Sequence, residues 1–389
     1  MKNVAIYLTG VQNIDGGGGA ERFFADFFSI YQSYPNRKFK LFFCCDKMTL
    51  NTLKSLDKLK DANNIIVLKN LSNRFKKYGE NIDFRLKLKK SKIDILHCAN
   101  YGRQDFDRLM SIKRNNTIKI LNIVDCQIPY ILNNINDIRS AIYNERYIYQ
   151  PNKIKFQGVF SWYQKFIEFS LENKIYNWNP LQKNINSRFT DTHKFKPNHI
   201  KKNIIVFASR MHFQKRPDWF IKAVSILRND LTLDLTEWQF FLFGDGNLSQ
   251  TIDDMIIEMN LDDIIHRQYS KDLADIFSKS KCFISTQDFE NFPSLSMMEA
   301  MASGNAIIAR NVGQTNLMIK DNKNGYLLSE DTPKGLARKI KKYILLSNND
   351  KINMQNQSLK LIKEVHNPKS FILQIEEFWI TLLEDKSQI

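Results

Sequence analysis

Apolar and polar positions follow two alternating patterns along this chain. Short apolar runs that suit buried strands are followed by stretches in which apolar residues recur about every three to four positions, as on one face of a helix. This alternation predicts an α/β fold with parallel sheets and right-handed crossovers. In the first half, the predicted strands are 3–8, 39–45, 64–68, 93–98, 118–124 and 155–160, and the predicted helices are 20–33, 80–91, 104–114 and 136–149.

A polar, Asn-rich stretch at 173–200 interrupts the alternation and is typical of a link between domains. At 389 residues the chain is also long for a single core. We therefore predict a first domain at 1–185, a second at 200–366 and a separate final segment at 367–389 with an apolar face. In the second half, the predicted strands are 203–207, 238–243, 264–268, 281–286, 305–309 and 325–328, and the predicted helices are 215–229, 249–259, 271–279, 294–303, 333–346 and 367–384.

The segment FENFPSLSMMEAMASG at 289–304 carries the most informative chemistry. Pro293 fits the start of a helix, and Ser294 is a suitable N-cap for it. A helix that begins at the carboxyl end of a strand in an α/β sheet lies where ligands bind, and its free amide groups attract a phosphate. Glu290 and Glu299 flank this predicted anion site. Two carboxylates around a phosphate suit a nucleotide-sugar better than a bare nucleotide.

The same segment resembles the Glu…Glu motif of the retaining GT-B glycosyltransferases of family 4, also described as glycosyl transferases group 1. The resemblance implies that Glu290 contacts the sugar and Glu299 the ribose, with Phe292, Ser294 and Leu295 also at the donor. The family usually has seven residues between the glutamates, whereas positions 291–298 here make eight. Either the turn absorbs the extra residue or Glu290 does not face the sugar, so Glu299 is the firmer assignment. The alternative is a plain strand, turn and helix with both glutamates as surface charges.

A second motif, FASRMHFQKRP at 207–217, follows the first strand of the second domain. It resembles the family segment G-R-x-x-x-x-K-G, with Arg210 and Lys215 at the family's offset and with Ser209 and Arg216 in place of the two glycines. Two fixed cations at a strand end would stabilise a diphosphate leaving group. The alternative is a loop with solvated charges.

Two glycine-rich turns also resemble family elements. Gly244 and Gly246 end a predicted strand, and they would let a backbone approach a ligand or the facing domain closely. Gly17, Gly18 and Gly19 precede the first helix in a G-G-A-E-R loop, which the resemblance places near the donor phosphate or the acceptor. This loop is not the G-x-G-x-x-G fingerprint of dinucleotide-binding enzymes.

His97 and Asp125 are the candidates in the first domain. The resemblance implies that His97 faces a cleft, whereas a histidine satisfied at the end of its strand is the other interpretation. Many relatives carry a His-Asp pair after the fifth strand, but here only Asp125 is present. Asp125 would contact the sugar or the acceptor, or would simply cap the next element.

The net charge of +16 belongs wholly to the first half. Residues 1–200 hold 33 Lys and Arg against 17 Asp and Glu, while residues 201–389 hold 24 of each kind. Basic residues interleave with apolar ones at 74–92, a composition that suits an anionic membrane surface or, alternatively, a nucleic acid or a solvated helix. The five cysteines form no C-x-x-C pair and no zinc-site spacing, so free thiols in a reducing compartment are expected.

The resemblance implies a GT-B architecture of two facing Rossmann-like domains, with a C-terminal helix that crosses back to the first domain. It also implies a retaining hexosyltransferase that needs no metal and no cofactor and moves a sugar from a nucleotide-sugar to a saccharide or lipid-linked acceptor, in bacterial polysaccharide or glycoconjugate synthesis. We find no signal-peptide pattern and expect a cytoplasmic protein with peripheral contact to the membrane. The alternatives are a basic nucleic-acid-binding protein, for which no motif is present, and another GT-B enzyme, either a phosphorylase or a sugar-nucleotide epimerase.

Overall fold

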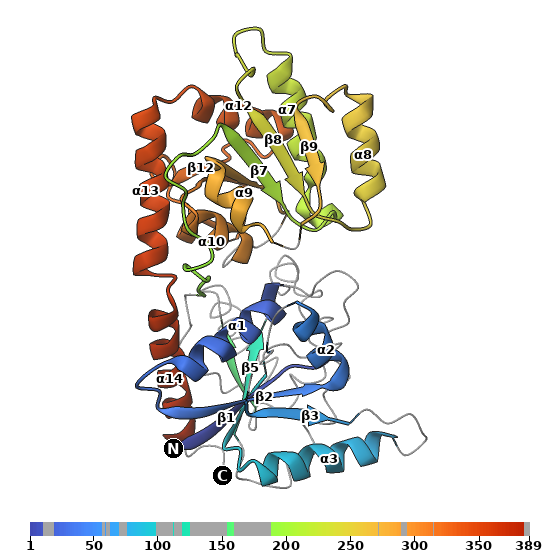
Figure 1. Ribbon diagram of the computed structural model, residues 1–389, viewed down its shortest axis with the longest axis vertical. Coiled ribbons are helices and arrows are strands. Elements are labelled where there is room, and N and C mark those ends of the chain that lie inside the picture. Colours follow the sequence, from blue (N-terminus) through green and yellow to red (C-terminus); the bar gives the residue numbers. More distant parts are fainter. Residues whose placement is uncertain are drawn as a thin grey trace, which may run out of the picture. The chain divides into compact units, whose positions relative to one another are not determined.

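The computed structural model forms two compact units, Met1–Asn186 with Pro368–Ile389, and Ser187–Asn367 (Figure 1). No helix within its described residues is long and apolar enough to cross a membrane. The structure describes residues 1–10, 19–56, 59, 63–69, 76–98, 112, 119–124, 154–158, 188–270, 272–288, 294–313 and 315–384.

The first unit is built on a six-stranded parallel sheet in the order β3-β2-β1-β4-β5-β6. The predicted strands of this half are confirmed to within two residues at each end, because each is a short run rich in apolar residues. The predicted helices at 104–114 and 136–149 lie outside the described residues, apart from residue 112. Its elements are β1 (Lys2–Tyr7), α1 (Gly19–Ser33), β2 (Phe39–Asp46), α2 (Lys47–Ser55), β3 (Ile65–Leu68), α3 (Lys76–Lys90), β4 (Ile95–Cys98), β5 (Lys119–Val124), β6 (Ile154–Gly158) and α14 (Pro368–Glu384).

Helix α14, the last of the described elements, packs against α1 of the first unit, as expected (Figure 1). The Phe371 ring lies edge-on to those of Phe23 and Phe27, with centroids 5.0 and 5.1 Å apart. Glu376 is buried in this interface, where its carboxylate accepts hydrogen bonds from the Tyr31 hydroxyl at 2.5 Å and the Lys38 amide at 2.8 Å. A buried carboxylate is tolerated because these donors replace its water.

The second unit repeats the same topology in the order β12-β11-β10-β7-β8-β9, again fully parallel. All of its predicted strands are confirmed, and a core made mainly of Ile, Leu and Phe side chains lies between the sheet and its helices. Its elements are β7 (Ile204–Ala208), the 3-10 helix η5 (Phe213–Lys215), α7 (Pro217–Arg228), β8 (Gln239–Phe243), α8 (Ser249–Glu258), β9 (Ile265–Gln268), α9 (Ala274–Lys279), β10 (Cys282–Ser285), α10 (Leu295–Ala302), β11 (Ala306–Ala309), α11 (Thr315–Met318), β12 (Gly325–Leu327), α12 (Pro333–Ile344) and α13 (Asn348–Glu364).

This strand order fixes where a ligand site lies in each unit. The first strand of each sheet is central, and the chain runs outward on one side before it returns to the other side. The order therefore reverses between β1 and β4 and between β7 and β10. The loops that leave two such strands at their carboxyl ends diverge and leave a crevice, which is the usual ligand site of an open parallel sheet.

Candidate functional site

A pocket opens at the reversal point of the second unit. Its walls are the carboxyl ends of β7 and β10, the loops that follow them and the start of α10. Lys215 and Ser294, both predicted as site residues, lie in its lining together. The lining residues are Phe207, Ala208, Ser209, Lys215, Phe283, Ile284, Ser285, Thr286, Gln287, Ser294 and Ser296.

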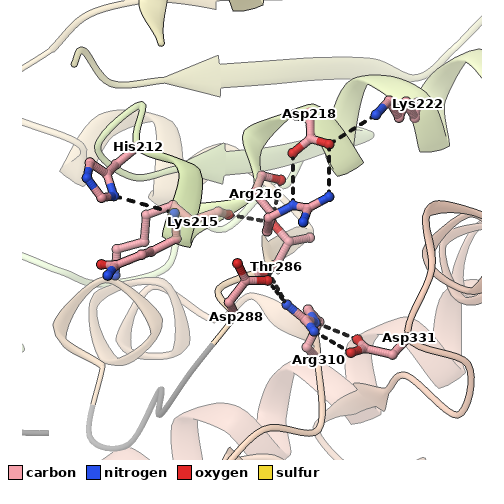
Figure 2. Close-up of polar contacts among 10 residues, drawn as sticks. His212, Lys215, Arg216, Asp218, Lys222, Thr286, Asp288, Arg310 and Asp331 are labelled. Atoms are coloured by element: carbon pink, nitrogen blue, oxygen red, sulfur yellow. Dashed lines mark hydrogen bonds and ion pairs between the residues drawn. The ribbon is translucent and has the colours of Figure 1, made fainter. Parts of the chain in front are cut away.

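Lys215, at the end of η5, is held in this pocket by the segment that follows β10. Its ammonium donates a hydrogen bond to the side-chain oxygen of Gln287. The Thr286 hydroxyl bonds to the carbonyl of Lys215 at 2.8 Å and to that of Arg216 at 3.0 Å (Figure 2). A half-buried cation at the end of a parallel strand is suited to neutralise a phosphate group.

Arg216 occupies a position where the family pattern has glycine, and its backbone is left-handed at φ +50° and ψ +49°. Glycine adopts this conformation without steric cost, which explains the family's preference. The Arg216 guanidinium turns away toward α7, where it bonds to both carboxylate oxygens of Asp218 at 3.1 and 3.2 Å (Figure 2). It also lies over the Trp219 ring. Arg216 is therefore engaged within the fold and adds no free cation to the pocket.

Arg210 lies at the start of the same loop, two residues after the end of β7, but it does not line the pocket. Its side chain is exposed, and its guanidinium forms no hydrogen bond or ion pair within the described part of the chain. Its backbone carbonyl is fixed by bonds from the Ser209 hydroxyl at 3.0 Å and the His212 amide at 2.9 Å. The structure thus brings Lys215, but not Arg210, into the pocket.

Gly244 and Gly246 serve the packing of this loop. A Cβ atom on Gly244 would lie 1.8 Å from the Ser209 carbonyl oxygen, and one on Gly246 would lie 2.6 Å from that of Met211. The Met211 amide also bonds to the Asp245 carbonyl at 2.9 Å. The close approach predicted for these glycines exists, but the backbone they approach belongs to the Arg210 loop.

Helix α10 starts as predicted. The Ser294 hydroxyl accepts a hydrogen bond from the Met297 amide at 3.4 Å, which confirms Ser294 as the N-cap. Leu295 is the first helical residue, and Glu299 lies one turn further on, half-buried. Glu290 and Phe292 lie outside the described residues, so the sugar-facing role of Glu290 stays a prediction.

His97 does not face a cleft, contrary to the role that the resemblance implied. It is fully buried within the first unit, where its ring meets the edges of Phe24 and Trp379, and its Nδ1 accepts a hydrogen bond from the Trp379 indole at 3.3 Å. Burial lowers the pKa of His97 to about 3, so the ring is neutral. The return of α14 over this part of the sheet explains the difference.

Of the other candidate residues in the first unit, the structure describes only Gly19. Gly19 is the first residue of α1. Gly17, Gly18 and Asp125 lie outside the described residues, and β5 ends at Val124, directly before Asp125.

One residue near the pocket, Arg310, was missed by the sequence analysis. Arg310 directly follows β11 and forms ion pairs with Asp288 and Asp331 (Figure 2). A cation immediately after the apolar run Ala306–Ala309 was the available signal, since it lies at the carboxyl end of an interior strand of the sheet.

Comparisons with known proteins match the part of the chain that contains this pocket. Residues 189–360 match the family model "Glycosyl transferases group 1". The GtfA subunit of a UDP-N-acetylglucosamine–peptide N-acetylglucosaminyltransferase from Limosilactobacillus reuteri is 34% identical over 132 residues, which are 33% of this chain and 24% of that protein. A poly(ribitol-phosphate) α-N-acetylglucosaminyltransferase from Staphylococcus aureus is 29% identical over 168 residues, or 42% of this chain and 32% of that protein. The matched region thus spans about a quarter to a third of these relatives' length.

Solved structures resemble the chain over nearly all of its length. A glycosyltransferase from Rickettsia africae superposes with a TM-score of 0.71 at 17% identity, covering 99% of both chains. The pneumococcal O-GlcNAc transferase GtfA, in complex with UDP and GlcNAc, gives a TM-score of 0.71 at 14% identity and the same coverage. The fold is therefore GT-B, as expected, and residues 189–360 of this chain match the model of the glycosyl transferases group 1 family.

Proposed function

We propose that this protein is a glycosyltransferase that moves a sugar from a nucleotide-sugar to a saccharide or lipid-linked saccharide in bacterial glycoconjugate or polysaccharide synthesis. One observation carries the proposal. The pocket at the β7–β10 reversal point unites the Lys215 cation with the capped start of α10, and both lie within the matched residues 189–360. A cation and free helix amides together form a site for a diphosphate.

The proposed donor is UDP-N-acetylglucosamine. The GtfA subunits and the Staphylococcus aureus enzyme are named for transfer of N-acetylglucosamine, and the GtfA names specify the UDP-linked sugar. The pocket residues Ser294 and Ser296 supply hydroxyl groups of the kind that bind an amide or a sugar hydroxyl.

In this proposal Lys215 and Arg210 stabilise the departing diphosphate, Glu299 binds the ribose and Glu290 binds the sugar. In this proposal the transfer retains the anomeric configuration. It needs no metal or other cofactor, because the two cations balance the phosphate charge. Product anomers identified by NMR, and activity measured in EDTA, test these two points. An inverted product, or activity that EDTA abolishes and Mg²⁺ restores, would contradict them.

Calorimetric titration with UDP-, GDP- and ADP-sugars tests the donor site. We expect UDP-N-acetylglucosamine to bind, and we expect Arg210→Ala and Glu299→Ala each to weaken binding about tenfold to a hundredfold, since each removes a contact to a charged or diol group. Arg338→Ala is the matched control, because Arg338 pairs with Glu330 on an exposed surface of the same unit.

Folded wild-type protein that binds none of these donors would refute the assignment. Binding to random DNA in place of the donor would favour the nucleic-acid alternative, whose affinity falls steeply with salt.

We further propose that α3 rests on an anionic membrane surface, which would bring the enzyme to a lipid-linked acceptor. Tyr78 and Leu86 of α3 are 70% and 61% exposed, although the same helix buries Phe84 and Leu88 completely. Ile82 lies between the two exposed residues at four-residue spacing, so apolar side chains also follow the outward face.

Charge complements this outward face. Lys89 and Lys90 are exposed in the last turn of α3, and the exposed Lys92 lies two residues beyond its end. Each basic residue near an anionic bilayer contributes about 1 kcal/mol of attraction, while exposed aromatic and aliphatic side chains insert at the lipid headgroups.

Sedimentation with lipid vesicles tests this surface. We expect binding to vesicles that contain phosphatidylserine, weaker binding to pure phosphatidylcholine, and a loss of about tenfold in the pair Tyr78→Ser with Leu86→Ser. Leu373→Ser is the matched control, since Leu373 is 48% exposed on α14. Equal binding by the α3 variant and the control, or binding that salt leaves unchanged, would count against this contact.

A further inference from the structure

Arg310 is a buried cation that joins two carboxylates from different parts of the second unit. Its side chain is 10% exposed; its Nε and Nη2 atoms bond to Asp331, and its Nη1 bonds to Asp288 (Figure 2). Burial alone disfavours the cation, but the bonds to both carboxylates outweigh it and raise the pKa of Arg310. The guanidinium is therefore a permanent link between these two aspartates.

The Asp288 end of this link leads to Lys215. Asp288 donates its backbone amide to the Gln214 carbonyl at 2.8 Å. The two residues before it, Thr286 and Gln287, contact the Lys215 backbone and ammonium. Each residue of Thr286–Asp288 thus bonds to the loop that carries Lys215.

The same guanidinium supports α7 from the other side. Arg310 lies over the Trp219 ring, with its central carbon 4.6 Å from the ring centroid, and the Arg216 guanidinium lies 5.1 Å from the same centroid. Arg310 itself does not line the pocket. Its effect on a ligand therefore passes through Asp288 and the residues that Asp288 orients.

We propose that Arg310 is a positioning residue for Lys215: by holding Asp288, it fixes the Thr286–Asp288 segment on which the Lys215 ammonium rests. Its consequence for donor binding rests on the proposed function, whereas its consequence for Lys215 itself does not. A guanidinium is needed because its fork pairs with Asp331 while a third nitrogen reaches Asp288, which the single ammonium of lysine does not reproduce.

A donor-independent readout is the reactivity of the Lys215 amine toward trace acetylation, measured by mass spectrometry relative to exposed Lys360. We expect Arg310→Gln and Asp288→Asn to raise the Lys215 rate several-fold, because the amine loses its fixed partner. Arg310→Lys should give an intermediate rate. Arg338→Gln, which breaks the exposed pair with Glu330, should leave the rate unchanged.

The donor readout is a double-mutant cycle with Lys215→Ala. We expect Arg310→Gln to weaken the binding of UDP-N-acetylglucosamine about tenfold in the wild-type background. In the Lys215→Ala background we expect it to weaken binding less than about twofold, because both substitutions then act on the same contact. Additive effects in folded variants would assign Arg310 a general structural role and overturn the proposal.

Unchanged Lys215 acetylation in folded Arg310→Gln protein would overturn the proposal as well. If the wild-type protein binds no nucleotide-sugar, the proposed function fails, and the acetylation rates alone decide whether Arg310 positions Lys215.

Discussion

Arg216 shows how a single residue can depart from its family's pattern and still keep the loop intact. A left-handed backbone costs a non-glycine residue about 1–2 kcal/mol. The bonds from Arg216 to Asp218 and its contact with the Trp219 ring offset this cost. The sequence shows Arg216 only as an additional cation beside Lys215. The pattern of charges does not reveal that its side chain turns toward α7.

His97 gives a residue-scale prediction for the pH dependence of stability. Its pKa is lowered to about 3 in the folded protein, against about 6.5 in an unfolded chain, so only the unfolded chain takes up a proton between these values. The stability contribution is complete above pH 6.5 and is lost as the pH falls toward 3. We expect a loss of about 1.4 kcal/mol per pH unit below pH 6 from this residue.

Urea unfolding of wild type, His97→Phe and His193→Phe at pH 7.5, 6 and 5 measures this contribution. The His97 variant should be less stable at pH 7.5, since the Trp379 indole loses its acceptor, but its stability should fall less steeply with acid. The exposed His193 variant should follow wild type. Parallel curves for all three proteins would contradict a neutral, buried His97.

At the scale of elements, apolar periodicity predicted the strands and most of the described helices, but it missed the four-residue helix α11 and two longer helices with largely polar faces, α2 and α13. Helix α13 buries Lys351, Gln355 and Ser358 alongside Met354 and Ile362, so its inward face does not stand out as an apolar stripe. Lys351 is accommodated because its ammonium bonds to two backbone carbonyls at 2.7 Å. Helix α2 buries only Thr49 and Leu53 and is equally inconspicuous.

The docking of α14 gives an element-scale prediction. Replacing Glu376 with Ala leaves the Tyr31 hydroxyl and the Lys38 amide without their buried acceptor, and an unsatisfied buried donor costs about 1–3 kcal/mol. We expect Glu376→Ala to lower the unfolding free energy by about 2–4 kcal/mol and to speed amide hydrogen exchange in α1. Glu377→Ala, on the exposed side of the same helix, is the control. Equal losses from the two variants would show that the buried bonds do not hold α14.

At the scale of the whole molecule, the topology was predictable because six apolar runs separated by helical stretches allow few arrangements of a parallel sheet. The position of the site followed from the same rule, and Ser294 and Lys215 indeed line one pocket. The supporting contacts were not predictable. Arg310 meets Asp288 and Asp331 across 22 and 21 positions of sequence, and no local pattern records such pairs.

The return of α14 also bears on how the chain folds as it leaves the ribosome. The first unit begins at Met1 but includes Pro368–Glu384, whereas the second unit is one continuous stretch. Phe371, Trp379 and the other core residues of α14 are therefore synthesised after the whole of the second unit. Although domains usually fold in the order of their synthesis, here the second unit is complete in the nascent chain first. The first unit waits for α14, and the aromatic face of α1 stays uncovered until translation has passed this helix.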